Sequence, residues 1–186
     1  MADKNKLEQA ARLILEAIGE DPNREGLLET PRRFAEMMEE QMAYTTVSNE
    51  EIARQFGKTF TSSEEGPVVV KDISIFSHCE HHLALMYHMR VSVGYIPHGR
   101  VIGLSKVARI ADAVSRRLQI QERIGADIRN IIEKVTGSSN VIVRIDGEHS
   151  CMAARGIKKP GAVTTTISSS GKFNTPEYRQ LFKDML

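Results

Sequence analysis

The chain has 186 residues, the size of one domain or of one domain with a helical extension. Its hydrophobic content of 41% is ordinary for a globular protein, and its 25 basic and 24 acidic residues leave a net charge of +1. This balance argues against a protein that coats nucleic acid or an anionic membrane, although a local cluster of cations could bind a small anion.

No targeting or membrane segment is visible in the sequence. The N-terminus lacks the apolar run of a signal peptide, and no stretch approaches the roughly 20 apolar residues needed to cross a bilayer. We therefore expect a cytoplasmic protein.

The first third of the chain has helical periodicity. Apolar residues between Leu7 and Ile18 recur at helical spacing. Thr30-Pro31 predicts the N-cap and first turn of a second helix, and Ser48 with Glu51 predicts a capping box for a third. We predict an N-terminal helical region over residues 1–60.

From residue 61 the pattern becomes two strands, two helices and two strands. Ser105 is expected to cap a helix whose buried side extends to Leu118, and Gly137 to close the helix that follows. A short C-terminal helix is expected to begin near Thr175-Pro176. The predicted strands cover residues 68–76, 89–95, 141–148 and 162–168.

This order predicts an α+β fold over residues 61–186, with an antiparallel four-stranded sheet and two helices on one face. Such a sheet has open edges, which favours oligomerisation.

Both cysteines have histidines beside them. In His78-Cys79-Glu80-His81-His82, after a predicted strand, Cys79 and His82 are three apart and can converge on one ion from a tight turn. His149-Ser150-Cys151 ends a later predicted strand, where residues two apart point to one face. A Cys–His–Cys set would give zinc three ligands and leave a fourth position for water, whose pKa zinc lowers toward neutrality.

The spacing leaves the role of the metal open. In an open, catalytic site, His81 and His149 would remain free for proton transfer. In a closed, structural site, one of them would be the fourth ligand. A metal-free arrangement is a weaker interpretation, because four ligand-type residues fall within five positions. His88 and His98 stand alone and are interpreted as ordinary histidines, and Arg116 and Arg117 as solvated helix residues.

Four motifs with chemistry in each occur in order along the chain. They are Ser77-x-Cys79-Glu80-His81-His82, Gly103-Leu104-Ser105-Lys106-x-x-Arg109-Ile110, Arg116-Arg117-Leu118-Gln119-x-Gln121-Glu122-Arg123 and His149-x-Cys151-Met152-x-x-Arg155-Gly156. In these motifs, in Thr30-Pro31-x-Arg33 and in Gly171-x-Phe173, the chain resembles GTP cyclohydrolase I over nearly its whole length.

The resemblance implies a role for each matching residue and favours the open zinc site. Cys79, His82 and Cys151 match the zinc ligands, and His81 and His149 match the proton-transfer histidines. The residues that match or adjoin the substrate contacts are Glu122 for guanine, Lys106, Arg109 and Arg155 for the triphosphate, and Ser105 and Gln121 for further hydrogen bonds.

The resemblance also implies a reaction and an assembly. GTP and water would be converted to 7,8-dihydroneopterin triphosphate and formate, the first step of tetrahydrofolate or other pterin biosynthesis. The implied fold is the tunnelling fold, assembled as a decamer of two stacked pentamers with active sites at subunit boundaries. No nucleic acid or membrane partner is expected.

Two alternatives and one departure accompany this interpretation. Nitrile reductases of the same fold need a thiol nucleophile, and this chain has no thiol beyond the two expected ligands. A non-enzymatic zinc-binding paralogue would not need Glu122 or the cations. The segment 83–90 is one residue longer than is usual in the family and lacks its Gly, which puts the local turn in doubt.

Overall fold

The computed structural model describes residues 2–186, which divide into two compact units between Thr46 and Val47. In the first unit, helices α1 (Lys4–Ala17) and α2 (Thr30–Gln41) are linked through a 3-10 turn, η1 (Glu25–Leu27). Both predicted helices are confirmed. The domain boundary predicted at residue 60 stays a prediction.

The expected cap of α2 was wrong by one position. Thr30 is already helical, and Glu29 precedes it as the N-cap without a side-chain cap bond. Pro31 lies in the first turn, where a backbone N–H would have no acceptor within the helix.

The second unit contains the sheet. Its helices are α3 (Asn49–Phe56), α4 (Leu104–Ser115), α5 (Gln121–Thr136), α6 (Ser150–Ala153), α7 (Pro176–Asp184) and the 3-10 turn η2 (Gly171–Asn174). Its strands are β1 (Thr59–Thr61), β2 (Val68–Cys79), β3 (Ala84–Tyr95), β4 (Arg100–Ile102), β5 (Leu118–Gln119), β6 (Val141–His149) and β7 (Val163–Ser169).

The main sheet has the order β5-β2-β3-β6-β7, and its four long strands are antiparallel as predicted. Two additions were missed. β5 pairs in parallel with the end of β2, and β1 pairs with β4 as a separate two-stranded ribbon. Strands of two or three residues are too short to show a periodic pattern.

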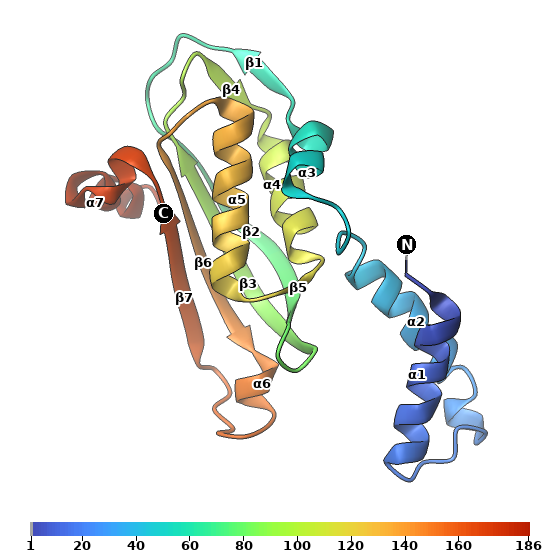
Figure 1. Ribbon diagram of the computed structural model, residues 1–186. Helices are drawn as coiled ribbons and strands as arrows, with labels where there is room; N and C mark the ends of the chain where they lie inside the picture. Colours follow the sequence, from blue (N-terminus) through green and yellow to red (C-terminus); the bar gives the residue numbers. More distant parts are fainter. Residues whose placement is uncertain (1) are drawn as a thin grey trace. The chain divides into compact units, whose positions relative to one another are not determined.

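Helices α4 and α5 cover one face of the sheet (Figure 1). Their apolar stripes are fully buried, which confirms the predicted core positions Val107, Ile110, Ala111, Val114, Ile124, Ile128 and Ile131. Gly137 closes α5 in the left-handed conformation with φ of 71°.

The ends of α4 differ from the prediction. Gly103 is the N-cap and Ser105 lies inside the first turn. The helix stops at Ser115, because the Ser77 hydroxyl of β2 donates to the Ser115 carbonyl (2.7 Å) and satisfies a group that a longer helix would use. Leu118 therefore lies in β5 and not on the helix.

Helix α3 begins with the predicted capping box between Ser48 and Glu51 and packs against α4 and α5. The guanidinium of Arg117 donates to Asn49 Oδ1 (2.9 Å) and to the Val47 carbonyl (2.7 Å). Only 14% of the Arg117 side chain is exposed. The prediction of a solvated Arg117 was wrong: the residue attaches the start of α3 to the rest of the unit.

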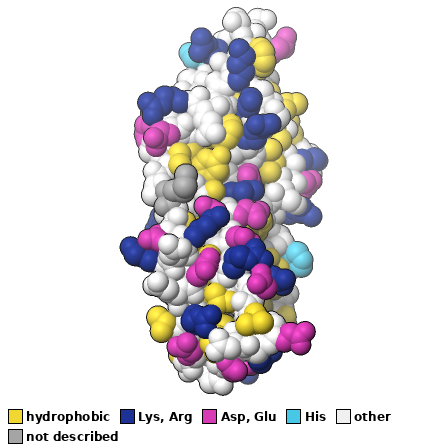
Figure 2. Space-filling view, turned by 90° about the vertical axis from the view of Figure 1, so that its right-hand side faces the viewer, with side chains coloured by type: hydrophobic (Ala, Val, Ile, Leu, Met, Phe, Trp, Pro, Cys, Tyr) yellow, Lys and Arg dark blue, Asp and Glu magenta, His cyan; other side chains and the backbone are white. Residues whose placement is uncertain are grey.

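The surface carries charges of both signs. On the face shown in Figure 2, Lys and Arg side chains are interspersed with Asp and Glu. Within residues 2–186, none of the helices combines the length and apolar composition that a membrane span requires.

Candidate metal centre and active site

Three donors of the type that binds zinc converge at one end of the second unit. Cys79 is the last residue of β2, His82 lies in the turn that follows, and Cys151 lies on α6. One ligand atom from each lies within 4.8 Å of the other two, and Cys79 Sγ is 4.0 Å from His82 Nδ1. Cys79 is buried, whereas His82 is exposed, so the group is open toward solvent on one side.

Cys151 reaches this group by a local structure other than the one predicted. Strand β6 ends at His149, and the chain then turns into α6, so Cys151 is helical and not extended. The Ser150 hydroxyl donates to the Leu85 carbonyl of β3 (2.7 Å) and holds the start of α6 beside the β2–β3 turn.

This donor set fits a zinc ion. Two thiols and one imidazole match the ligand types of tetrahedral zinc, and three protein ligands are the number found in catalytic sites. Burial raises the pKa of the Cys151 thiol, and the neighbouring Cys79 raises it further. A cation at this position would favour both thiolates and remove that cost.

His149 lies beside the donor group and is partly buried. Its Nε2 is 2.9 Å from Gln121 Oε1, at the first turn of α5. Burial lowers the pKa of His149, and the nearby Glu122 carboxylate opposes that shift. The structure thus brings His149, Gln121 and Glu122 to the same end of the unit as the three donors.

The turn after Cys79 is attached to the start of α5. Arg123 makes a bidentate ion pair with Glu80 (2.7 and 3.2 Å), and the Glu80 N–H donates to the Gln119 carbonyl (3.1 Å). The Arg123 guanidinium lowers the pKa of Glu80. Neither Glu80 nor Arg123 was predicted as a site residue, because their pairing joins segments that are remote in sequence.

Two further predicted residues lie at this end. His81 is exposed, with its ring centroid 6.4 Å from that of His82. Arg155, which follows α6, donates from Nη1 to His82 Nε2 (3.0 Å). Arg155 can therefore place a positive charge at the open side of the donor group.

The other predicted substrate contacts do not lie there. Ser105, Lys106 and Arg109 belong to the first half of α4, whose last residue, Ser115, is the one that contacts β2 near Cys79. At 1.5 Å per residue, Lys106 lies about 14 Å along the helix from Ser115. Figure 1 shows the β2–β3 turn, α6 and the start of α5 at one end of the sheet, and the start of α4 at the other end.

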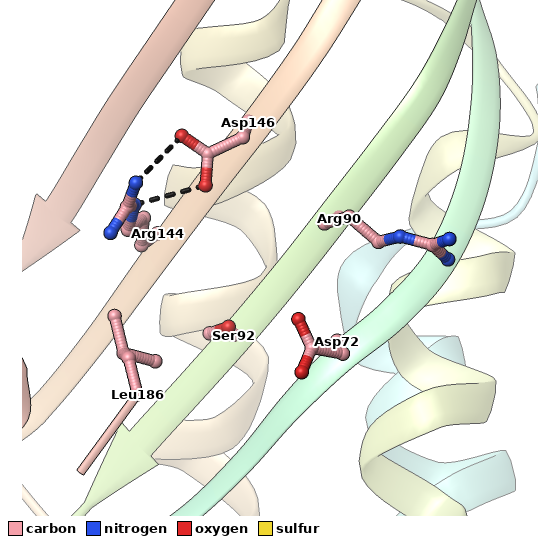
Figure 3. A pocket seen from close by; sticks show the side chains of 6 residues that line it. All are labelled: Asp72, Arg90, Ser92, Arg144, Asp146 and Leu186. Atoms are coloured by element: carbon pink, nitrogen blue, oxygen red, sulfur yellow. Dashed lines mark hydrogen bonds and ion pairs between the residues drawn. The ribbon is translucent and has the colours of Figure 1, made fainter.

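A separate hollow of about 200 Å³ opens on the face of the sheet away from α4 and α5 (Figure 3). Arg144 and Asp146 form an ion pair there, with Nε and Oδ2 3.0 Å apart. None of the residues predicted as site residues lines this hollow, whose lining is Asp72, Arg90, Ser92, Arg144, Asp146 and Leu186.

Comparisons with known proteins identify the family of the chain. A family model described as GTP cyclohydrolase I matches residues 7–186. GTP cyclohydrolase 1 of Clostridium acetobutylicum is 58% identical over 180 residues, covering 94% of this chain and 92% of that protein. The Clostridium beijerinckii protein of the same name is 57% identical over 179 residues, covering 93% and 91%.

One solved structure, that of the archaeosine synthase QueF-Like in the apo form, gives a TM-score of 0.46 at 18% identity, covering 59% of this chain and 96% of that chain. The family model and the two Clostridium relatives span nearly all of the chain that carries the converged Cys–His–Cys group. On these grounds the chain belongs to the GTP cyclohydrolase I family, whose tunnelling fold is the α+β architecture described above.

Proposed function

We propose that this chain is a zinc-dependent enzyme that converts GTP and water to 7,8-dihydroneopterin triphosphate and formate, as the first step of tetrahydrofolate or other pterin biosynthesis. The observation that carries the proposal is the convergence of Cys79, His82 and Cys151 beside His149 and Glu122 in a chain of this family. A purely structural zinc site would need neither the histidine nor the carboxylate.

Cys79, His82 and Cys151 would hold the ion, and zinc bound there would supply a Lewis acid that makes a water molecule reactive at neutral pH. Side chains of the protein would carry out the proton transfers and hold the substrate. His149 would give a proton to the purine ring nitrogen as the imidazole ring opens, and His81 would serve later proton transfers.

Glu122 and the cations would hold the substrate. The exposed Glu122 carboxylate can accept hydrogen bonds from the guanine N1–H and amino group. Arg155 would bind phosphate oxygens, together with Lys106 and Arg109.

The reaction is tested with purified, zinc-loaded protein and GTP, by measuring formate and, after oxidation, neopterin triphosphate. Both products are expected in equal amounts, and both are abolished by a chelator and by His149→Ala. Formate without pterin would contradict the proposed product. No product from a folded protein with bound zinc would overturn the enzyme proposal in favour of the non-enzymatic zinc-binding paralogue.

We further propose that the enzyme is an oligomer, a decamer of two stacked pentamers, with each active site at a boundary between subunits. Lys106 and Arg109 lie at the end of the unit opposite the donor group, so a single chain supplies an incomplete site. A second copy that brings the start of its α4 to the donor group would complete it.

Mixing two inactive variants tests this boundary. His149→Ala and Lys106→Ala are co-expressed in equal amounts, and each is also assayed alone. If the two residues act from different copies, about a quarter of the sites in a random mixture are intact, so about a quarter of the wild-type activity returns. If both act from one chain, the mixture stays as inactive as the separate variants.

A further inference from the structure

The side chain of Gln121 is buried, with 1% of the residue exposed. It is the first residue of α5 and lies over the strands β6 and β7. Its Nε2 donates to the carbonyls of Ile145 (3.0 Å) and Thr164 (2.9 Å) and lies 3.3 Å from Thr166 Oγ1. A side chain so enclosed and so fully bonded within the chain has little left for a substrate.

These contacts determine which way the amide faces. The two carbonyls can only accept, so the NH₂ end of Gln121 must point at them and Oε1 must point away. Oε1 is the atom that lies 2.9 Å from His149 Nε2. Because an amide oxygen only accepts, the Nε2 of His149 must carry the hydrogen.

The space for this amide comes from Gly147 on β6. A Cβ at residue 147 would lie 3.2 Å from Gln121 Oε1 and 3.0 Å from Met89 Cγ. Any larger residue at this position would therefore crowd the oxygen that faces His149. The absence of a side chain at Gly147 thus supports the same placement of Gln121 Oε1, independently of the hydrogen bonds.

We propose that Gln121 is a positioning residue that holds His149 as the Nε2–H tautomer and leaves Nδ1 as the ring nitrogen that exchanges a proton with the substrate. This inference rests on the proposed function of His149 in proton transfer. It replaces the direct substrate contact expected for Gln121 from the sequence.

The tautomer is measured first, by magic-angle-spinning NMR of the zinc-loaded protein labelled with ¹⁵N-histidine. The chain has six histidines, and a His149→Gln sample assigns the signal of interest. We expect a protonated Nε2 and an unprotonated Nδ1 in the wild-type protein. A protonated Nδ1 with a bare Nε2 would overturn the proposal, whatever the protein does with GTP.

Kinetics of Gln121→Met provide the second readout, since Met has a similar length and makes no such hydrogen bonds. We expect kcat to fall about 100-fold with KM for GTP within about twofold, because the loss is one of orientation and not of binding. In the same variant, the ¹⁵N signals of His149 should no longer show a protonated Nε2 with an unprotonated Nδ1. A raised KM with unchanged kcat would show that Gln121 contacts the substrate and would refute the positioning role.

Gln119→Met is the matched control. Gln119 is equally buried at the same end of the unit, but its amide bonds to the Val114 carbonyl and to Asp127. Its replacement should lower thermal stability while leaving the His149 signal and kcat unchanged. If Gln119→Met lowers kcat as much as Gln121→Met does, the effect is a general response to a lost buried amide and the proposal fails.

Discussion

The carboxylate of Asp127 on α5 is the centre of a partly buried polar network, and its removal should destabilise the second unit. Asp127 accepts hydrogen bonds from Asn49 Nδ2 (2.9 Å) and Gln119 Nε2 (3.2 Å), and it lies 3.5 Å from Arg117 Nη1. Burial lowers the pKa of Arg117, and the charge of Asp127 opposes that shift. Asp127→Ala would remove the carboxylate that faces this guanidinium.

The expected loss of unfolding free energy follows from the low solvent exposure of the Arg117–Asp127 pair. The exposed fractions of the Arg117 and Asp127 side chains are 14% and 16%. Removing one partner of a buried pair costs about 3–5 kcal/mol, and the residual exposure places Asp127→Ala near the lower limit, at about 3 kcal/mol. For a chain of this length that corresponds to a fall in Tm of about 6–12 °C.

Thermal unfolding of zinc-loaded protein, at equal protomer concentration for every variant, measures the effect. Lys134→Ala is the control, because Lys134 and Glu50 also join α5 to α3 (3.3 Å) but with exposed fractions of 55% and 64%. It should lower the Tm much less than Asp127→Ala does, because water screens an exposed pair. Adding Arg117→Met to Asp127→Ala should recover part of the stability, since the buried charge that Asp127 faced is then gone. Equal losses in Asp127→Ala and Lys134→Ala, or a further loss in the double variant, would refute the reasoning.

Substitutions at four other residues test further features. Ile128→Ala should cost about 3 kcal/mol in urea unfolding, because Ile128 lies fully buried on α5 and its truncation leaves a cavity; a cost below about 1 kcal/mol would mean that the cavity collapses. His88, at φ of 48°, should accept Asn with little change, whereas Val should cost about 1–2 kcal/mol in the same assay, since a β-branched residue resists this conformation. Ser48→Ala should cost about 1 kcal/mol through the lost cap of α3. The bond from the Ser48 N–H lowers the pKa of Glu51, so the stabilisation by Glu51 is complete above the pKa of the unfolded chain and is lost as the pH falls through the folded value. The stability difference between wild type and Glu51→Gln should therefore vanish in acid, and a difference independent of pH would contradict the capping-box assignment.

Most of the fold was predictable because its long elements have clear periods and boundary residues. Helix α5 shows this best: its buried isoleucines recur at helical spacing, and Gly137 supplies the left-handed cap. The missed end of α4 depends on a hydroxyl of β2, Ser77, which no local pattern reveals. The same holds for Arg117, whose partners Val47 and Asn49 are about 70 positions away in sequence.

The sequence indicated which residues form the donor group better than it indicated the elements on which they lie. Cys79 and His82 converge as their spacing indicates, whereas Cys151 arrives from a helix that the apparent strand pattern concealed. The separation of Lys106 from the donor group was not visible either, because a motif gives no information about which end of a helix lies over which end of a sheet.

Strand β3 contains an irregularity that leaves the strand ends at the candidate site in register. Between Tyr87 and Arg90, three steps along β3 pair with two along β6, and the pairing with β2 shows the same shift, so β3 contains a β-bulge. Met86 and Met89 are both buried although three apart, positions that point to opposite faces in a regular strand. The bulge therefore keeps the apolar side chains on both sides of it on the buried face of the sheet. It requires a positive φ at His88. Met86 still pairs with His149, on the side of the bulge nearer the Cys–His–Cys group, so the ends of β3 and β6 beside that group keep their register.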